Sequence, residues 1–151
     1  MTTLLVVHHT PSPATRDLLE AVLAGARDPE VDGVDVVARP ALGATVTDVL
    51  DADGYLFGTP ANFGYMSGAL KHFFDTVYYT VLDQVAGRSY GLWVHGNDDT
   101  VGAVASVERI VTGLALCRAA GVLEVTGPVD KAVRERAYEL GGTLAAVLME
   151  G

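Results

Sequence analysis

The sequence predicts a doubly wound α/β fold, a three-layer sandwich with a five-stranded parallel sheet in the order 2-1-3-4-5. Two observations predict it. Five short runs rich in β-branched residues alternate with five amphipathic segments, and the runs are apolar almost throughout, as strands covered on both faces must be. At 151 residues the chain suits a single domain, 1–151, and is too short for an eight-stranded α/β barrel.

Each predicted strand is a short apolar run that stops at a polar or glycine-containing loop. In chain order the runs are Leu4–Val7, Val34–Val37, Tyr55–Phe57, Tyr90–Val94 and Val122–Val125. Right-handed crossovers place the intervening helices on both faces of the sheet. In this strand order a ligand binds outside the carboxyl ends near the first and third strands. The loops after the first, third and fourth strands are therefore the ones to examine for function.

Apolar residues at helical spacing mark the segments between the strands. The four clear stripes are Leu18, Leu19, Val22, Leu23 and Ala26; Leu70, Phe73, Phe74, Val77 and Val81; Val104, Val107, Val111 and Leu114; and Val133, Ala137, Leu140, Leu144 and Leu148. The segment Thr45–Leu50 is a weaker helix, because its threonine and valine residues have low helix propensity. Cys117 follows the third stripe, and we interpret it as a small core residue within a helix.

Composition and charge exclude several classes of function. The net charge is −9, whereas nucleic-acid-binding proteins carry clustered lysine and arginine, so no nucleic acid partner is expected. No segment approaches the ~20 apolar residues of a membrane span, and the run Leu4–Val7 is too short for the core of a signal peptide. A single cysteine cannot form an internal disulfide, which favours a reducing compartment. We therefore expect a cytoplasmic protein with no membrane partner.

The loop after the first strand combines hydroxyl side chains with the start of a helix. Thr10, Ser12 and Thr15 carry the hydroxyls, with Pro13 and Ala14 between them. The free N–H groups and the dipole of a helix N-terminus favour an anion, so this loop is typical of a phosphate site that needs no basic residue. The alternative is that Thr10 or Ser12 only caps the helix, with Pro13 in its first turn.

The loop after the third strand carries amide, aromatic and glycine residues together. After Gly58 and Thr59 it continues through Pro60, Ala61, Asn62, Phe63, Gly64 and Tyr65. Flat aromatic surface beside an amide, which offers both a donor and an acceptor, suits a planar polar ring system. For either aromatic side chain the alternative is a core or dimer contact. For Asn62 the alternative is a turn residue in the left-handed conformation.

Two of these loops resemble those of a known family. Thr10-x-Ser12-Pro13-Ala14-Thr15 is similar to the T/S-x-T/S-G-x-T phosphate loop of flavodoxin-like proteins. The stretch from Gly58 to Gly68, GTPANFGYMSG, resembles the GTPxxFGxMSG loop of the flavodoxin-like NAD(P)H:quinone oxidoreductases. The resemblance implies a flavodoxin-like fold with FMN as cofactor. It places the phosphate in the first loop and the isoalloxazine ring against the second and third loops.

The resemblance also implies a set of cofactor-binding residues. They are Thr10, Ser12, Pro13, Ala14 and Thr15 in the first loop, Pro60, Ala61, Asn62, Phe63, Gly64 and Tyr65 in the second, and His95, Gly96, Asn97 and Asp98 in the third. Phe63 or Tyr65 would stack on the ring. Pro13 departs from the family, which usually has glycine there. Because proline has no N–H and cannot reach positive φ, we expect weaker FMN binding than in a tight-binding flavodoxin.

The third loop, from His95 to Thr100, is more acidic than in the reductases it resembles. Carboxylates near the pyrimidine edge of a flavin would disfavour the anionic reduced ring and lower its reduction potential. The alternative is that Asp98 and Asp99 cap the following helix and complement its dipole. His95 either donates a hydrogen bond to cofactor or substrate, or is a strand-end residue with a backbone partner.

No hydrolytic triad, paired carboxylates or metal-ligand spacing is evident in the sequence, so we predict neither catalytic side chains nor a metal site. Flavin chemistry needs none of these, because the protein mainly holds the ring and excludes water. The resemblance therefore implies an FMN-dependent oxidoreductase, and the absence of other catalytic arrangements agrees with it. Such an enzyme would take electrons from NAD(P)H and pass them to a quinone or a similar small acceptor.

Two alternative functions stay open. A flavodoxin-type electron carrier would use its acidic surface to dock onto basic redox proteins. A degenerate domain would have lost flavin binding through Pro13 and the acidic third loop. The resemblance also implies assembly as a homodimer or tetramer, with the pair Tyr78-Tyr79 as a candidate contact.

Overall fold

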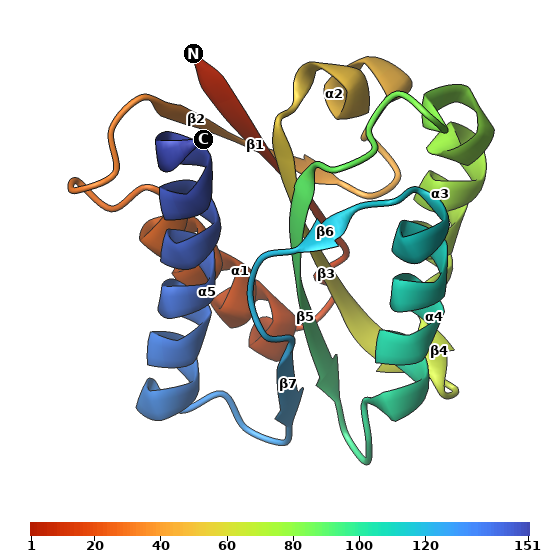
Figure 1. Ribbon diagram of the computed structural model, residues 1–151. Helices are drawn as coiled ribbons and strands as arrows, with labels where there is room; N and C mark the ends of the chain where they lie inside the picture. The colour runs from red at the N-terminus through yellow and green to blue at the C-terminus, as the bar shows by residue number, and fades with distance from the viewer.

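A central sheet lies between two layers of helices, with α1 and α5 on one face and α2, α3 and α4 on the other (Figure 1). The computed structural model describes residues 1–151. Its elements are β1 (Thr2–His8), α1 (Pro13–Ala26), β2 (Val34–Pro40), α2 (Val46–Asp51), β3 (Gly54–Asn62), β4 (Tyr65–Met66), α3 (Gly68–Val81), β5 (Ser89–Gly96), α4 (Val101–Gly113), β6 (Cys117–Arg118), β7 (Leu123–Thr126) and α5 (Lys131–Glu150). None of the helices is both long and apolar enough to cross a membrane.

Parallel pairing sets the strand order β2-β1-β3-β5, and β6 and β7 both pair with the free side of β5. Cys117 of β6 pairs with Ser89 at the start of β5, and Leu123 of β7 pairs with Trp93 nearer its end. The two short strands are therefore halves of one interrupted edge strand, and the predicted order 2-1-3-4-5 is confirmed. The short β4 is antiparallel to β3. The prediction of an entirely parallel sheet is therefore wrong at this strand.

The prediction for Cys117 is wrong. Helix α4 ends at Gly113, and Ala115 follows with a φ of 59°, which turns the chain back toward the sheet. Cys117 is the first residue of β6, where its N–H donates to the carbonyl of Arg88 at 2.9 Å. Its side chain is exposed, because β6 lies at the edge of the sheet.

Each face of the sheet has its own apolar core. Successive side chains of a strand point to opposite faces, so Val7 packs with α3 and α4 while Val6 packs with α1 and α5. Trp93 is fully buried on the second face and lies against Gly58, where a Cβ would come within 1.9 Å of the indole ring. This double coverage explains why the strands are apolar throughout.

Helices α1 and α5 approach each other at two glycine residues. A Cβ at Gly25 would lie 1.9 Å from the carbonyl oxygen of Tyr138, and one at Gly141 would lie 2.0 Å from the carbonyl oxygen of Val22. Backbone therefore touches backbone, and a larger residue at either position would force the helices apart.

Replacing Gly141 with alanine is expected to lower the free energy of unfolding by about 1–3 kcal/mol, because the added methyl group overlaps the backbone of α1. Gly142 is the matched control, since its Cβ would meet nothing closer than 3.5 Å. Alanine at Gly142 should raise the free energy of unfolding by about 0.5–1 kcal/mol, because alanine favours the helix. Urea unfolding measures both changes, and equal effects would contradict the close helix contact.

Candidate functional site

Three loops leave the same edge of the sheet side by side. His8 of β1 pairs with Gly58 of β3, and Pro60 of β3 pairs with His95 of β5. The N–H of His9 also donates to the carbonyl of Gly58 at 3.0 Å. Because β3 and β5 run parallel toward the lower edge of Figure 1, the chain leaves both strands there. The loops predicted to carry the site are thus brought together.

The first loop is folded as a helix cap. Ser12 is the N-cap of α1, and Pro13 is its first residue. The Ser12 hydroxyl accepts from the N–H of Thr15 at 3.2 Å, and the Thr15 hydroxyl accepts from the N–H of Ser12 at 3.0 Å. This reciprocal pair is a capping box. The hydroxyl of Thr10 lies 3.2 Å from Nδ1 of His8. The capping interpretation of Ser12 is confirmed.

The second loop is a β-hairpin. Strand β3 continues through Pro60 to Asn62, which pairs with Tyr65 of β4. Phe63 and Gly64 form the turn, with φ values of 51° and 71°. Positive φ at both central residues is the requirement of a type I′ turn. The left-handed position next to glycine is therefore taken by Phe63, and the interpretation of Asn62 as that residue is wrong.

Phe63 is an unusual residue for this position. A positive φ is an outlier for a bulky side chain and costs on the order of 1 kcal/mol. The side chain is also fully exposed, so burial does not compensate for that cost. An asparagine–glycine pair would satisfy the turn better. A strained aromatic residue on an exposed hairpin points to contact with a ligand.

Helix α4 holds the hairpin in place. The N–H of Met66 donates to the buried hydroxyl of Ser106 at 3.0 Å. A Cβ at Gly102 would lie 1.9 Å from the carbonyl oxygen of Gly64, so the first turn of α4 touches the hairpin turn. Neither Ser106 nor Gly102 was among the predicted site residues. The available signal was a glycine just before the apolar stripe that starts at Val104, because glycine is unfavourable within a helix.

The third loop begins at the end of β5. The Nε2–H of His95 donates to the carbonyl of Gly127 at 2.8 Å, which is the backbone partner expected of a strand-end residue. A Cβ at Gly96 would lie 2.4 Å from the carbonyl oxygen of Asp99, so glycine allows the loop to fold back closely. These two predicted residues shape the loop.

Neither acidic side chain of the third loop caps α4. Its N-cap is Thr100, which makes no side-chain capping hydrogen bond and instead donates to the Glu124 carboxylate at 2.8 Å. Asp99 lies one position and Asp98 two positions before Thr100, outside the capping position, and both are exposed together with Asn97. The interpretation of these aspartates as capping residues is therefore wrong, and their carboxylates face solvent.

A cleft of about 260 Å³ lies between the hairpin and the third loop. Its lining residues are Ala61, Phe63, Gly64, Asn97, Asp98 and Asp99. Asp99 is the lining residue that was not among the predicted site residues. The other predicted residues of these two loops belong to the flanking strands and do not line the cleft; they are Pro60, Asn62, Tyr65, His95 and Gly96.

The backbone of the cleft offers free hydrogen-bond donors on both sides. The N–H groups of Phe63 and Gly64 have no acceptor within the chain, and the same holds for Asn97 and Asp98. Donors on two walls, beside an aromatic side chain, can bind a flat ring that carries carbonyl oxygens and ring nitrogens. The site is thus suited to planar heterocycles.

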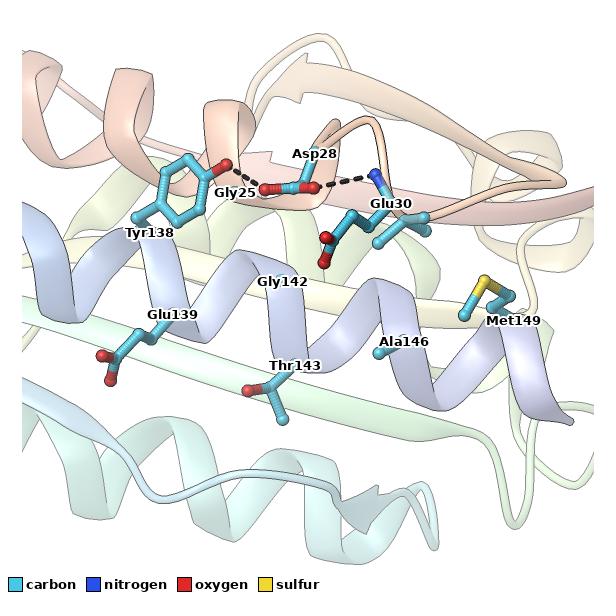
Figure 2. Close-up of a pocket in the computed structure, with 10 residues that line it drawn as sticks. Gly25, Asp28, Glu30, Tyr138, Glu139, Gly142, Thr143, Ala146 and Met149 are labelled. Carbon is cyan, nitrogen blue, oxygen red and sulfur yellow. Dashed lines mark hydrogen bonds between the residues drawn. The ribbon is translucent and has the colours of Figure 1, made fainter.

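A larger hollow lies elsewhere on the surface, between α1 and α5. It has a volume of about 520 Å³, and Figure 2 shows Tyr138 of α5 pointing toward Asp28, which follows α1. The hydroxyl of Tyr138 donates to the Asp28 carboxylate and lowers the pKa of Asp28 below its usual value. Glu30 and Glu139 also line this groove. It lies away from the carboxyl ends of the strands, and its acidic lining disfavours anions.

The fold and the three loops define a flavodoxin-like protein. A flavodoxin from the domain Archaea matches the structure with a TM-score of 0.79 at 15% identity, over 97% of this chain and 99% of that one. The flavodoxin, WrbA-like protein from Agrobacterium tumefaciens matches with a TM-score of 0.73 at 16% identity, over 99% of both chains. At such identities the likeness establishes the fold alone.

The family model described as NADPH-dependent FMN reductase matches residues 12–123, and the chain belongs to this family. A flavodoxin of Aquifex aeolicus is 35% identical over 100 residues, which are 62% of this chain and 53% of the flavodoxin. An NAD(P)H dehydrogenase (quinone) of Geobacter sulfurreducens is 31% identical over 102 residues, which are 68% of this chain and 40% of the dehydrogenase. The chain spans about half the length of the sequence relatives it matches.

The cleft residues fit the ring of the FMN that the family implies. The hairpin and third-loop residues that line the cleft have N–H groups without an acceptor in the chain, and Phe63 adds exposed aromatic surface. The first loop leaves the neighbouring strand of the sheet, so a phosphate attached to the same ligand would approach Thr10 to Thr15. The hydroxyls present there are chemically suited to a phosphate, although the loop is closed by its own hydrogen bonds.

Replacing Phe63 with asparagine is expected to raise the free energy of unfolding by about 0.5–1 kcal/mol, because asparagine tolerates positive φ and no buried surface is lost. Flavin binding by the same variant should weaken, because the aromatic surface is gone. Thermal unfolding and flavin titration measure the two effects. Tyr79, an exposed aromatic residue in α3, is the control, and asparagine there should not stabilise the chain. A destabilised Phe63 variant would count against the strained turn.

Proposed function

We propose that this chain is an FMN-binding oxidoreductase that takes electrons from NAD(P)H and passes them to a quinone or a similar small acceptor. The observation that carries the proposal is the cleft between the hairpin and the third loop, with unpaired N–H groups on both walls. Membership of the NADPH-dependent FMN reductase family supports it. The NAD(P)H dehydrogenase (quinone) of Geobacter sulfurreducens is a relative that favours a quinone as acceptor.

The chain's own residues would bind and orient the flavin. A bound flavin supplies a ring that accepts hydride and gives up electrons. The N–H groups of Phe63 and Gly64 would donate to one edge of the ring, and those of Asn97 and Asp98 to a neighbouring edge. The contact of Gly102 with Gly64 would fix the hairpin against α4, and so fix the position of one wall of the cleft.

The acidic third loop would lower the reduction potential of a bound flavin. Asp98 and Asp99 line the cleft, and no basic side chain lines it with them. Their negative charge opposes the build-up of negative charge on a reduced flavin, which lowers its reduction potential. A lower potential favours passing electrons onward to an acceptor over storing them on the flavin.

A second candidate function is that of a flavodoxin-type electron carrier. The net charge of −9 favours it, because an acidic surface steers encounters with basic redox proteins. The likeness to the flavodoxin of Aquifex aeolicus also favours it. A carrier would bind FMN in the same cleft but would not oxidise NAD(P)H without a separate reductase.

Assembly as a homodimer or tetramer is a further part of the proposal. Tyr79 supports this assembly, because its aromatic side chain lies on α3 and is exposed on the surface of the chain. Tyr78, the other residue of the predicted contact pair, is partly buried and lies close to Gly113 of α4, so it contributes less to an outer surface.

The proposal predicts flavin-dependent oxidation of NAD(P)H by the purified chain with a water-soluble quinone, followed by the loss of nicotinamide absorbance. Turnover should rise with added FMN to a plateau. FMN binding without NAD(P)H oxidation would favour the electron carrier. If the absorbance spectrum of FMN did not change when the chain was added, the chain would instead be a degenerate, non-flavin domain.

Two glycine variants tie the activity to the cleft. Gly102→Ala should lower flavin-dependent turnover by about tenfold or more, because the new methyl group displaces the hairpin at Gly64. Gly68→Ala is the matched control, since nothing lies within 4 Å of its Cβ, and its turnover should be unchanged. Equal turnover in the two variants would count against the cleft as the site.

A further inference from the structure

The first loop uses most of its hydrogen-bonding groups within itself. Pro11 and Pro13 have no N–H to offer. The N–H of Ser12 is taken by the Thr15 hydroxyl at 3.0 Å, and the N–H of Thr15 by the Ser12 hydroxyl at 3.2 Å. The Thr15 hydroxyl, which is buried, in turn donates to the Ser12 carbonyl at 3.0 Å. The loop is therefore self-satisfied before any anion arrives.

Few donors and no ready cation remain for an anion at this loop. Among its backbone N–H groups, only those of Thr10 and Ala14 have no acceptor in the chain. No lysine or arginine precedes Arg16, and Arg16 is exposed. His8 is close to the Thr10 hydroxyl, but burial, together with the neighbouring His9, lowers the pKa of His8 and favours its neutral form. A phosphate would gain little charge stabilisation.

The cleft between the hairpin and the third loop, where the flavin ring would bind, has unpaired donors instead. Its unpaired N–H groups lie on the hairpin turn and in the third loop, where no side chain of the protein competes for them. A ring can bind there without breaking a hydrogen bond. A phosphate, in contrast, must either use the remaining donors of the first loop or open the capping box, which costs about as much as a typical cap contributes, roughly a tenfold factor in equilibrium.

We propose that this chain recognises flavins by the ring and gains little from the phosphate, so that it binds riboflavin nearly as well as FMN. The inference rests on the proposed function and deepens it by widening the class of flavin that the site accepts. Pro13 is the specificity-determining residue, because it offers no N–H at the first position of α1, where Ser12 and Thr15 already close the cap.

The two dissociation constants test this directly. Flavin fluorescence is followed as the full chain is added to FMN and, separately, to riboflavin at the same ionic strength. FMN should bind less than about tenfold more tightly than riboflavin, because one charge-assisted hydrogen bond corresponds to roughly that factor. A larger preference for FMN overturns the inference and leaves the proposed function standing. Binding of neither flavin overturns the proposed function and the inference with it.

Substitutions at Pro13 assign the effect to that residue. Pro13→Gly and Pro13→Ala each restore an N–H, and the alanine variant keeps a good helix former in the first turn should the glycine variant fold poorly. Either change should strengthen FMN binding by about tenfold and leave riboflavin binding unchanged. Pro29→Ala, at an exposed proline beyond the other end of α1, is the control and should alter neither. FMN binding that stays the same in a folded Pro13 variant overturns the role of Pro13.

Discussion

The parallel pairing of β3 with β1 on one side and with β5 on the other determines both the layers of the fold and the position of its loops. Parallel strands need crossover connections, so the helices must lie on both faces of the sheet, and the strands between them must be apolar on both sides. Val6 and Val7 enter separate cores for this reason. The same pairing aligns Gly58 with His8 and Pro60 with His95, and so sets the three loops beside one another.

The candidate site combines a strained hairpin turn with a first loop whose hydrogen-bonding groups are mostly paired within the loop. Phe63 keeps a positive φ and full exposure on the hairpin, and the backbone contact between Gly64 and Gly102 fixes where that hairpin stands. At the first loop, Ser12 and Thr15 complete a capping box that stabilises α1 but leaves little for a ligand. The first loop thus contributes mainly to the stability of α1, and the cleft beside the hairpin keeps the free groups that can bind a ligand.

The strand order, the five main helices and the meeting of the three loops at one edge of the sheet could be predicted from the sequence, because they follow from hydrophobic periodicity and from the parallel-sheet rule. Ser12 as a cap was likewise readable from hydroxyl and proline positions. The hairpin was not, since its turn has Phe63 where asparagine or glycine signals such turns. The position of Cys117 in a strand could not be predicted, because the residue with positive φ in the preceding turn is Ala115 and not a glycine. Contacts such as Gly102 with Gly64 arise only in the folded chain.

Titration of the chain with FMN tests directly whether the three strand-end loops form a flavin site. The titration is monitored through the backbone amide chemical shifts in NMR spectra. The largest shifts should fall on the hairpin and the third loop, at Phe63, Gly64, Asn97 and Asp98, with smaller ones in the first loop. Shifts confined to the groove between α1 and α5, around Tyr138 and Met149, would contradict the account.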